Sequence, residues 1–212
     1  MGTSGLEKTV LAELADAFSA RGFKKRAGYK FTIEIGPDVI GRFAVTRSSP
    51  PPYESIVAMP LVGVRYEPSA RLVDEVLGRQ HALLTPTLQI GLFYLVPRLG
   101  PGDGLWEFGR EPCSRRATVD DLMRCMDEAG IPFMQALNTP GAILKELEGR
   151  NPQDSQSRYE AAVLRWSIGE RDLGASLLRA LIDQGRGTEP GSQPDYFGGA
   201  AARTLELVGE HV

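Results

Sequence analysis

Hydrophobic positions recur along this chain with two different periods, and the period predicts which segments form helices and which form strands. Residues 4–21 carry an apolar residue every three or four positions, the spacing of one helix face. From residue 29 to residue 47 apolar and polar residues alternate, as in strands with one solvated face, and Gly36-Pro37-Asp38 interrupts the alternation with turn residues. The pattern predicts an amphipathic helix followed by an antiparallel hairpin.

Two further apolar runs are predicted to extend the sheet. Residues 56–66 form a third strand candidate, in which Pro60 indicates an edge or a bulge because proline has no N–H to donate. A helical spacing follows at residues 68–79. The dense apolar run at residues 88–96 is predicted to be an interior strand.

The remainder of the chain has helical periodicity. Thr118 and Asp121 are predicted to open a helix that Gly130 closes, and Asp120 and Asp121 to complement its N-terminal dipole. Further helices are predicted at residues 140–148, 156–168, 171–184 and 198–210.

These elements predict an α+β fold. An N-terminal helix and a β-hairpin belong to a sheet of about four strands, mixed or antiparallel, with helices on one face. The helical hairpin at 156–184 is similar to a single tetratricopeptide-type unit, which cannot bury its own apolar face alone. We therefore expect an α+β domain at residues 1–150 and a helical C-terminal extension at residues 151–212 that caps it.

Composition and charge limit the cellular compartments and the classes of partner that the sequence predicts. Hydrophobic residues make up 42% of the chain and charged residues 24%, which is ordinary for a globular protein. The net charge of -3 does not indicate nucleic acid as a partner, and the longest apolar runs are about half of a membrane span, so no membrane partner is expected. Cys113 and Cys125 are too few for a disulfide framework, which favours the reducing cytoplasm.

Motifs for chemistry are sparse. Glycines at positions 100, 102 and 104 do not complete a dinucleotide-binding motif, because Glu107 stands where the next glycine belongs. His81 and His211 have no spacing that suits a metal, and no nucleophile is paired with a base in a recognisable motif. The sequence therefore predicts no cofactor, no metal and no catalytic residue.

Two groups of residues are candidates for binding a partner. Lys24, Lys25, Arg26 and Lys30 form a basic cluster that could meet phosphate or an acidic protein surface; the alternative is a solvated turn that protects a strand edge. A second group combines aromatic residues in predicted loops with two arginines: Tyr53, Trp106, Tyr196, Arg115 and Arg116. Each aromatic residue could equally cover the edge of the core.

Two short segments carry a family resemblance. They are Arg21-Gly22-Phe23-Lys24-Lys25-Arg26, after the first helix, and Ala129-Gly130-Ile131-Pro132-Phe133, after a later one, with Trp106 between them. With the order of elements, residues 5–148 resemble an uncharacterised family of bacterial domains of unknown function, some of which look like immunity proteins encoded beside toxins. The resemblance implies no catalytic residues, and Pro50-Pro51-Pro52 and the helices after residue 155 depart from the family pattern.

Two classes of function follow. The first is a cytoplasmic protein-binding module, such as an immunity-like inhibitor that occludes a bacterial toxin. The second is a small-molecule sensor or enzyme whose site leaves no local motif. Residues 113–212 carry 11 basic and 15 acidic side chains, which favours a basic protein as partner under the first hypothesis.

Overall fold

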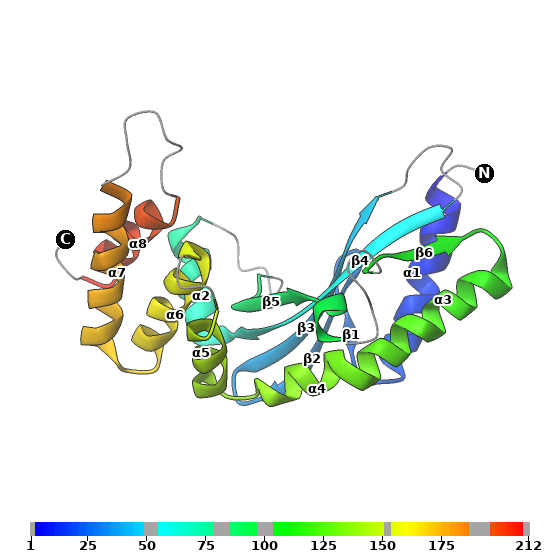
Figure 1. Cartoon of the computed structure of the whole chain (residues 1–212), viewed down its shortest axis with the longest axis horizontal. Coiled ribbons are helices and arrows are strands. Elements are labelled where there is room, and N and C mark those ends of the chain that lie inside the picture. The colour runs from blue at the N-terminus through cyan, green and yellow to red at the C-terminus, as the bar shows by residue number, and fades with distance from the viewer. Residues whose placement is uncertain are drawn as a thin grey trace. The chain divides into compact units, whose positions relative to one another are not determined.

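The computed structural model describes residues 3–48, 55–78, 85–96, 104–150, 154–186 and 196–209 (Figure 1). The chain packs into two compact units. Unit 1 comprises residues 1–35, 40–64 and 89–136, and unit 2 comprises residues 36–39, 65–88 and 137–212. The division into domains at residue 150 stays a prediction, because unit 2 combines the C-terminal helices with two earlier segments of the chain.

The first helix and the hairpin build the core of unit 1 as their periodicities predict. Helix α1 spans Thr3–Ser19, and the chain turns at Gly22 in the left-handed region with φ of 82°. Phe18, near the end of α1, lies fully buried against Phe31 and Phe43 of the hairpin, with ring centroids 4.5 Å and 4.3 Å away. Aromatic packing of this kind fixes the helix on the sheet.

Within the described residues the sheet has six strands, and the α+β fold class is confirmed. The strands are β1 (Lys24–Lys25), β2 (Lys30–Gly36), β3 (Val39–Ser48), β4 (Ser55–Tyr66), β5 (Leu88–Gly91) and β6 (Trp106–Gly109). They are ordered β1-β2-β3-β4-β5, and β6 pairs with β4 in antiparallel register from Ser55 opposite Gly109 to Ala58 opposite Trp106. Two of the six strands, β1 and β6, were not foreseen as strands.

One face of the sheet is covered by helices. Phe43 and Gly41 lie two residues apart on β3 and therefore point to the same face. Phe43 meets helix α1, and a Cβ at Gly41 would lie 3.1 Å from the Met134 sulfur of helix α4 (Ile131–Ala136). Glycine at position 41 thus allows α4 to approach the sheet closely.

Two expectations about the strands are corrected. Pro60 lies inside β4, which has β3 on one side and β5 and β6 on the other, so β4 is not an edge strand, and a bulge at Pro60 stays a prediction. It lies just beyond the part of β4 that pairs with β6, at residues 55–58. The run at residues 88–96 is not one strand, because β5 ends at Gly91 and a 3-10 helix, η1, spans Leu92–Leu95.

The helix expected at residue 118 begins earlier and does not end at Gly130. Helix α3 spans Pro112–Cys125 and continues through a π-helical turn, η2 (Met126–Gly130), into α4. Gly130 is required here for space, because a Cβ would lie 2.7 Å from the Met126 sulfur and 3.2 Å from Leu92. The predicted register is nevertheless correct, since Cys125 is fully buried.

Unit 2 is mainly helical. Its helices are α2 (Glu67–Val76), α5 (Pro140–Glu148), α6 (Ser155–Ser167), α7 (Arg171–Arg186) and α8 (Tyr196–Leu207), and Gly169 forms the left-handed turn between α6 and α7. Buried side chains from α2, α6, α7 and α8 share one core, among them Val73, Tyr159, Leu178 and Leu205. The predicted hairpin of α6 and α7 is therefore buried against α2 and α8 rather than standing alone.

Candidate binding surface

Helix α3 and the π-helical turn η2 that continues it are each held in unit 1 by an arginine–carboxylate pair with α1 or its C-terminal turn. The Arg115 guanidinium donates to both carboxylate oxygens of Glu13 over 2.8 Å, and these hydrogen bonds raise the pKa of Arg115. Arg21 makes the equivalent two-pronged contact with Asp127 over 2.6–2.7 Å. Two-pronged pairs of this type fix orientation as well as distance, so the surface around α3 is preorganised.

The start of α3 explains why its acidic residues were misplaced. Glu111 is the N-cap residue, and its carboxylate accepts a 2.6 Å hydrogen bond from the Ser114 N–H, which lowers the pKa of Glu111. Asp120 and Asp121 therefore lie in the middle of α3 and do not complement its N-terminus. Because glutamate is not among the favoured N-cap residues, the sequence indicated Thr118 instead.

A first groove lies between α1 and α3. It has a volume of about 390 Å³, and Asp16 and Arg116 are among the residues that line it, together with Glu13 and Asp120. Within the described parts of the chain, the carboxylates of Asp16 and Asp120 and the guanidinium of Arg116 have no ion-pair partner. These three charges are consequently available to a partner.

A second groove, also of about 390 Å³, lies between β6 and α3. Its walls include Leu105, which is 56% exposed, and Trp106, which is only 5% exposed. The Trp106 indole N–H donates a 3.0 Å hydrogen bond to Asp121 Oδ2. Glu107 lines the same groove, and its carboxylate makes no ion pair with any residue that the structure describes.

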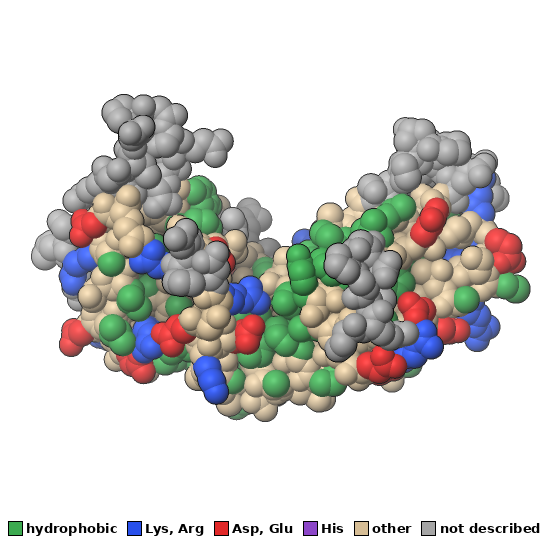
Figure 2. Space-filling view, viewed as in Figure 1, with side chains coloured by type: hydrophobic (Ala, Val, Ile, Leu, Met, Phe, Trp, Pro, Cys, Tyr) green, Lys and Arg blue, Asp and Glu red, His purple; other side chains and the backbone are tan. Residues whose placement is uncertain are grey.

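Exposed apolar side chains continue beyond this groove. Tyr94 of η1 is 72% exposed, and its ring lies against that of Phe93 with centroids 3.9 Å apart. A Cβ at Gly104 would lie 2.6 Å from the Phe93 ring, so Gly104 packs closely on this ring. Leu105 is the next residue in the chain. Figure 2 shows several acidic side chains along the part of unit 1 that holds α3, with basic side chains among them.

The structure places three of the five predicted partner-binding residues around α3. Trp106 lies in strand β6 and not in a loop, and Arg115 is engaged with Glu13, so of the two arginines only Arg116 is exposed with no ion-pair partner among the described residues. Tyr196 is half exposed at the start of α8, in unit 2, where its ring meets Phe197 edge to face. Tyr53 lies outside the described residues.

The basic cluster is partly engaged by its own sheet. Lys24 and Lys25 form the edge strand β1, and Lys24 makes a 2.9 Å ion pair with Glu34, which lowers the pKa of that carboxyl. Arg26 donates a 2.9 Å hydrogen bond to Thr32 Oγ1. This arrangement favours the alternative reading, a charged strand edge, although binding of phosphate stays a prediction.

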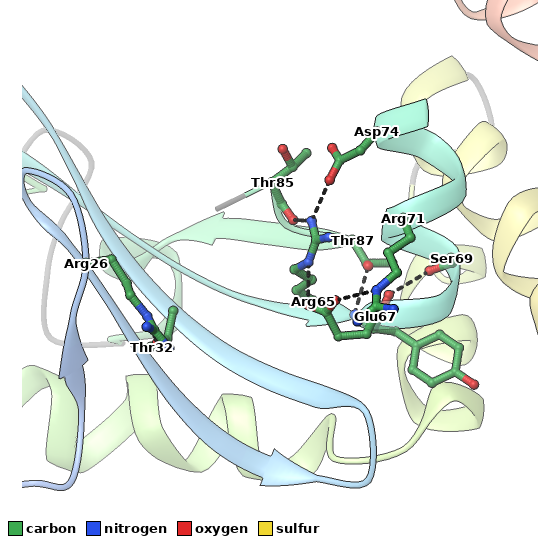
Figure 3. A network of polar contacts seen from close by, with 10 residues as sticks. Arg26, Thr32, Arg65, Glu67, Ser69, Arg71, Asp74, Thr85 and Thr87 are labelled. Carbon is green, nitrogen blue, oxygen red and sulfur yellow. Dashed lines mark hydrogen bonds and ion pairs between the residues drawn. The ribbon is translucent and has the colours of Figure 1, made fainter. Parts of the chain in front are cut away.

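A buried polar network in unit 2 is a second cluster of charges (Figure 3). Arg65 donates to Glu67 over 2.7 Å, to Asp74 over 3.1 Å and to the Thr85 carbonyl over 2.9 Å. Arg65 and Asp74 are almost completely buried, with 1% and 0% of their side chains exposed. These contacts hold the end of β4 to α2.

Sequence reasoning missed Leu105, Glu107 and Asp121 as a group, because their proximity depends on pairing of β6 with β4 and on the early start of α3.

In the described part of the chain, no group of three or more histidine, cysteine, aspartate or glutamate side chains is placed to hold a metal ion. No described helix is long and apolar enough to cross a membrane.

Comparison with known proteins adds no relative: the chain matches no family model, no curated protein and no solved structure.

Proposed function

We propose that this chain is a protein-binding module and that it binds a basic partner through the α3 face. The α3 face is defined as Asp16, Arg116 and Asp120 around the first groove and Leu105, Trp106, Glu107 and Asp121 around the second. The observation that carries the proposal is the exposed Leu105 in one groove with Glu107, whose carboxylate has no ion-pair partner among the described residues, next to a second groove lined by Asp16 and Asp120, which likewise have none.

This arrangement matches the anatomy of protein interfaces. A few apolar or aromatic anchors supply most of the affinity, and a polar rim around them sets specificity. Here the exposed Leu105 is the anchor, supported by the nearly buried Trp106 next to it in β6, while the carboxylates of the rim favour a positively charged partner and speed its approach. The resemblance to immunity-like domains favours a toxin as that partner, bound by occlusion of a basic substrate-binding surface.

The partner to test is the product of the neighbouring gene. If that protein binds, Leu105→Ser and Asp120→Lys are each expected to weaken the complex about tenfold or more in isothermal titration, because one removes an anchor and the other reverses a rim charge. Leu173→Ser is the matched control, since Leu173 is a leucine of similar exposure, 46%, in unit 2. It should change the affinity less than about twofold.

The second candidate function is that of a small-molecule sensor, and a cavity of about 170 Å³ in unit 2 supports it. Its apolar walls are formed by Leu147, Ala161 and Leu177, beside Arg158. If the neighbouring protein does not bind, and a small metabolite instead raises the melting temperature in proportion to its concentration, the binding-module proposal is wrong. Equal loss of affinity in Leu173→Ser and Leu105→Ser would also contradict the choice of surface.

A further inference from the structure

The cavity of about 170 Å³ in unit 2 is lined by residues of α5, α6 and α7. Leu147 of α5 and Ala161 of α6 form its apolar floor, because only 4% and 5% of their surface is exposed. Leu177 of α7 is half-buried and completes the apolar wall. A cavity of about 150 Å³ with apolar walls is large enough to bind benzene, so this one accommodates a group of that size.

Four polar side chains line the same cavity in the described part of the chain, and three of them are engaged within the protein. The Ser157 hydroxyl donates a 2.6 Å hydrogen bond to the carboxylate of the residue that caps α6. The Glu148 carboxylate accepts a 3.0 Å hydrogen bond from Arg165 Nε. The Arg150 guanidinium lies 3.8 Å from the carboxylate of Glu146.

Arg158, the fourth polar residue of the cavity, keeps its charge uncompensated. Its side chain is half-buried, and its Nη1 atom donates to the side-chain oxygen of Gln184, which is neutral. Arg158 makes no ion pair with any residue that the structure describes. A guanidinium carries five N–H donors, so most of the donors of Arg158 remain available to an anion. A partly buried cation of this kind is usually paired with a carboxylate.

We propose that this cavity binds a small organic acid. Its apolar part, about the size of a benzene ring, lies on the floor formed by Leu147 and Ala161, and its carboxylate pairs with Arg158 in the two-pronged geometry that a guanidinium favours. A cationic ligand would face the charge of Arg158, while Glu148, the one carboxylate among the described lining residues, is held by Arg165. The site belongs to unit 2, and the inference does not rest on the proposed function of the α3 face.

The test uses the whole chain with benzoate as the probe and benzyl alcohol, which has the same ring without the charge, as its match. Benzoate should shift the backbone amide signals of Ser157, Arg158 and Ala161 in a saturable way, with a dissociation constant in the millimolar range. Residues 104–111 of unit 1 should not respond. Benzyl alcohol should bind about tenfold more weakly, because it cannot accept charge-assisted hydrogen bonds from Arg158.

Three variants sharpen the result. Arg158→Met should weaken benzoate binding about tenfold and leave the affinity for benzyl alcohol unchanged, whereas Arg158→Lys, which keeps the charge, should lose only about threefold. Arg203→Met is the matched control, since Arg203 is an exposed arginine of α8 that is not among the residues of the cavity, and it should change neither affinity.

Equal affinity for benzoate and benzyl alcohol, equal losses in Arg158→Met and Arg203→Met, or no saturable shift with benzoate would each overturn the inference. None of these results bears on the α3 face, whose binding of the neighbouring protein is tested through Leu105 and Asp120.

Discussion

Replacing Arg65 with methionine is expected to lower the free energy of unfolding of unit 2 by about 3–5 kcal/mol. Arg65 is the cation of the buried network, and its removal leaves the fully buried Asp74 without its ion-pair partner. The other Asp74 oxygen, Oδ1, has no hydrogen-bond partner among the described residues, so nothing there compensates the buried charge once Arg65 is gone. Urea unfolding followed by the fluorescence of Trp166, in unit 2, measures the loss.

Two comparisons separate the buried charge from other effects of this substitution. Arg71→Met removes a cation from the same Glu67, but Arg71 is 68% exposed, so the loss should stay below about 1 kcal/mol. The double variant Arg65→Met/Asp74→Leu removes both buried charges and should recover most of the stability. If Arg65→Met cost no more than Arg71→Met, the buried network would not be stabilising unit 2.

Gly36→Ala is expected to destabilise unit 2 by about 3 kcal/mol, the upper end of the usual cost of overpacking, because the backbone has to move. A Cβ at Gly36 would collide with the Asn138 carbonyl oxygen and would lie 3.2 Å from its carbon. The obstacle is main chain and not the end of a flexible side chain, so the contact between the hairpin turn and residue 138 must open. Urea unfolding with the Trp166 signal measures the change.

Gly141→Ala provides the matched control for that substitution. A Cβ at Gly141 meets nothing within 4 Å, and the residue lies in the first turn of α5. Alanine there should leave stability unchanged or raise it by up to about 1 kcal/mol, because alanine favours helix more than glycine does. Losses of equal size at both positions would show that the close contact with Asn138 is not what limits position 36.

Local periodicity was sufficient to predict most elements of the fold. Val10, Leu14 and Phe18 lie on one buried stripe of α1, and the alternation around Phe31 and Phe43 gave the hairpin, because both patterns follow directly from burial of one face. The predictions were wrong where tertiary contacts override local signals. Gly130 looked like a helix end, but its lack of a side chain makes room for Met126 and Leu92.

Only part of the candidate surface could be predicted from the sequence. Trp106 was selected as an aromatic residue in a predicted loop and Arg116 as an arginine suited to an interface, and both line grooves beside α3, although Trp106 lies in β6 and is nearly buried. The role of Asp121 was misjudged, because the Glu111 N-cap has a weak sequence signal and the hydrogen bond from Trp106 joins residues on two separate elements. Similarly, nothing in the pattern around Arg65 distinguishes a buried ion pair from a charge at the end of a strand.

The most direct test of the central claim is amide hydrogen exchange of the chain alone and in complex with the product of the neighbouring gene. Binding at the α3 face should slow exchange at residues 104–111, which lead through β6 into α3, and at residues 92–96 around Tyr94. Exchange in α7 and α8 of unit 2 should not change. Protection confined to α7 and α8, with residues 104–111 exchanging as in the free chain, would show that the partner binds elsewhere and that the α3 face is not the functional surface.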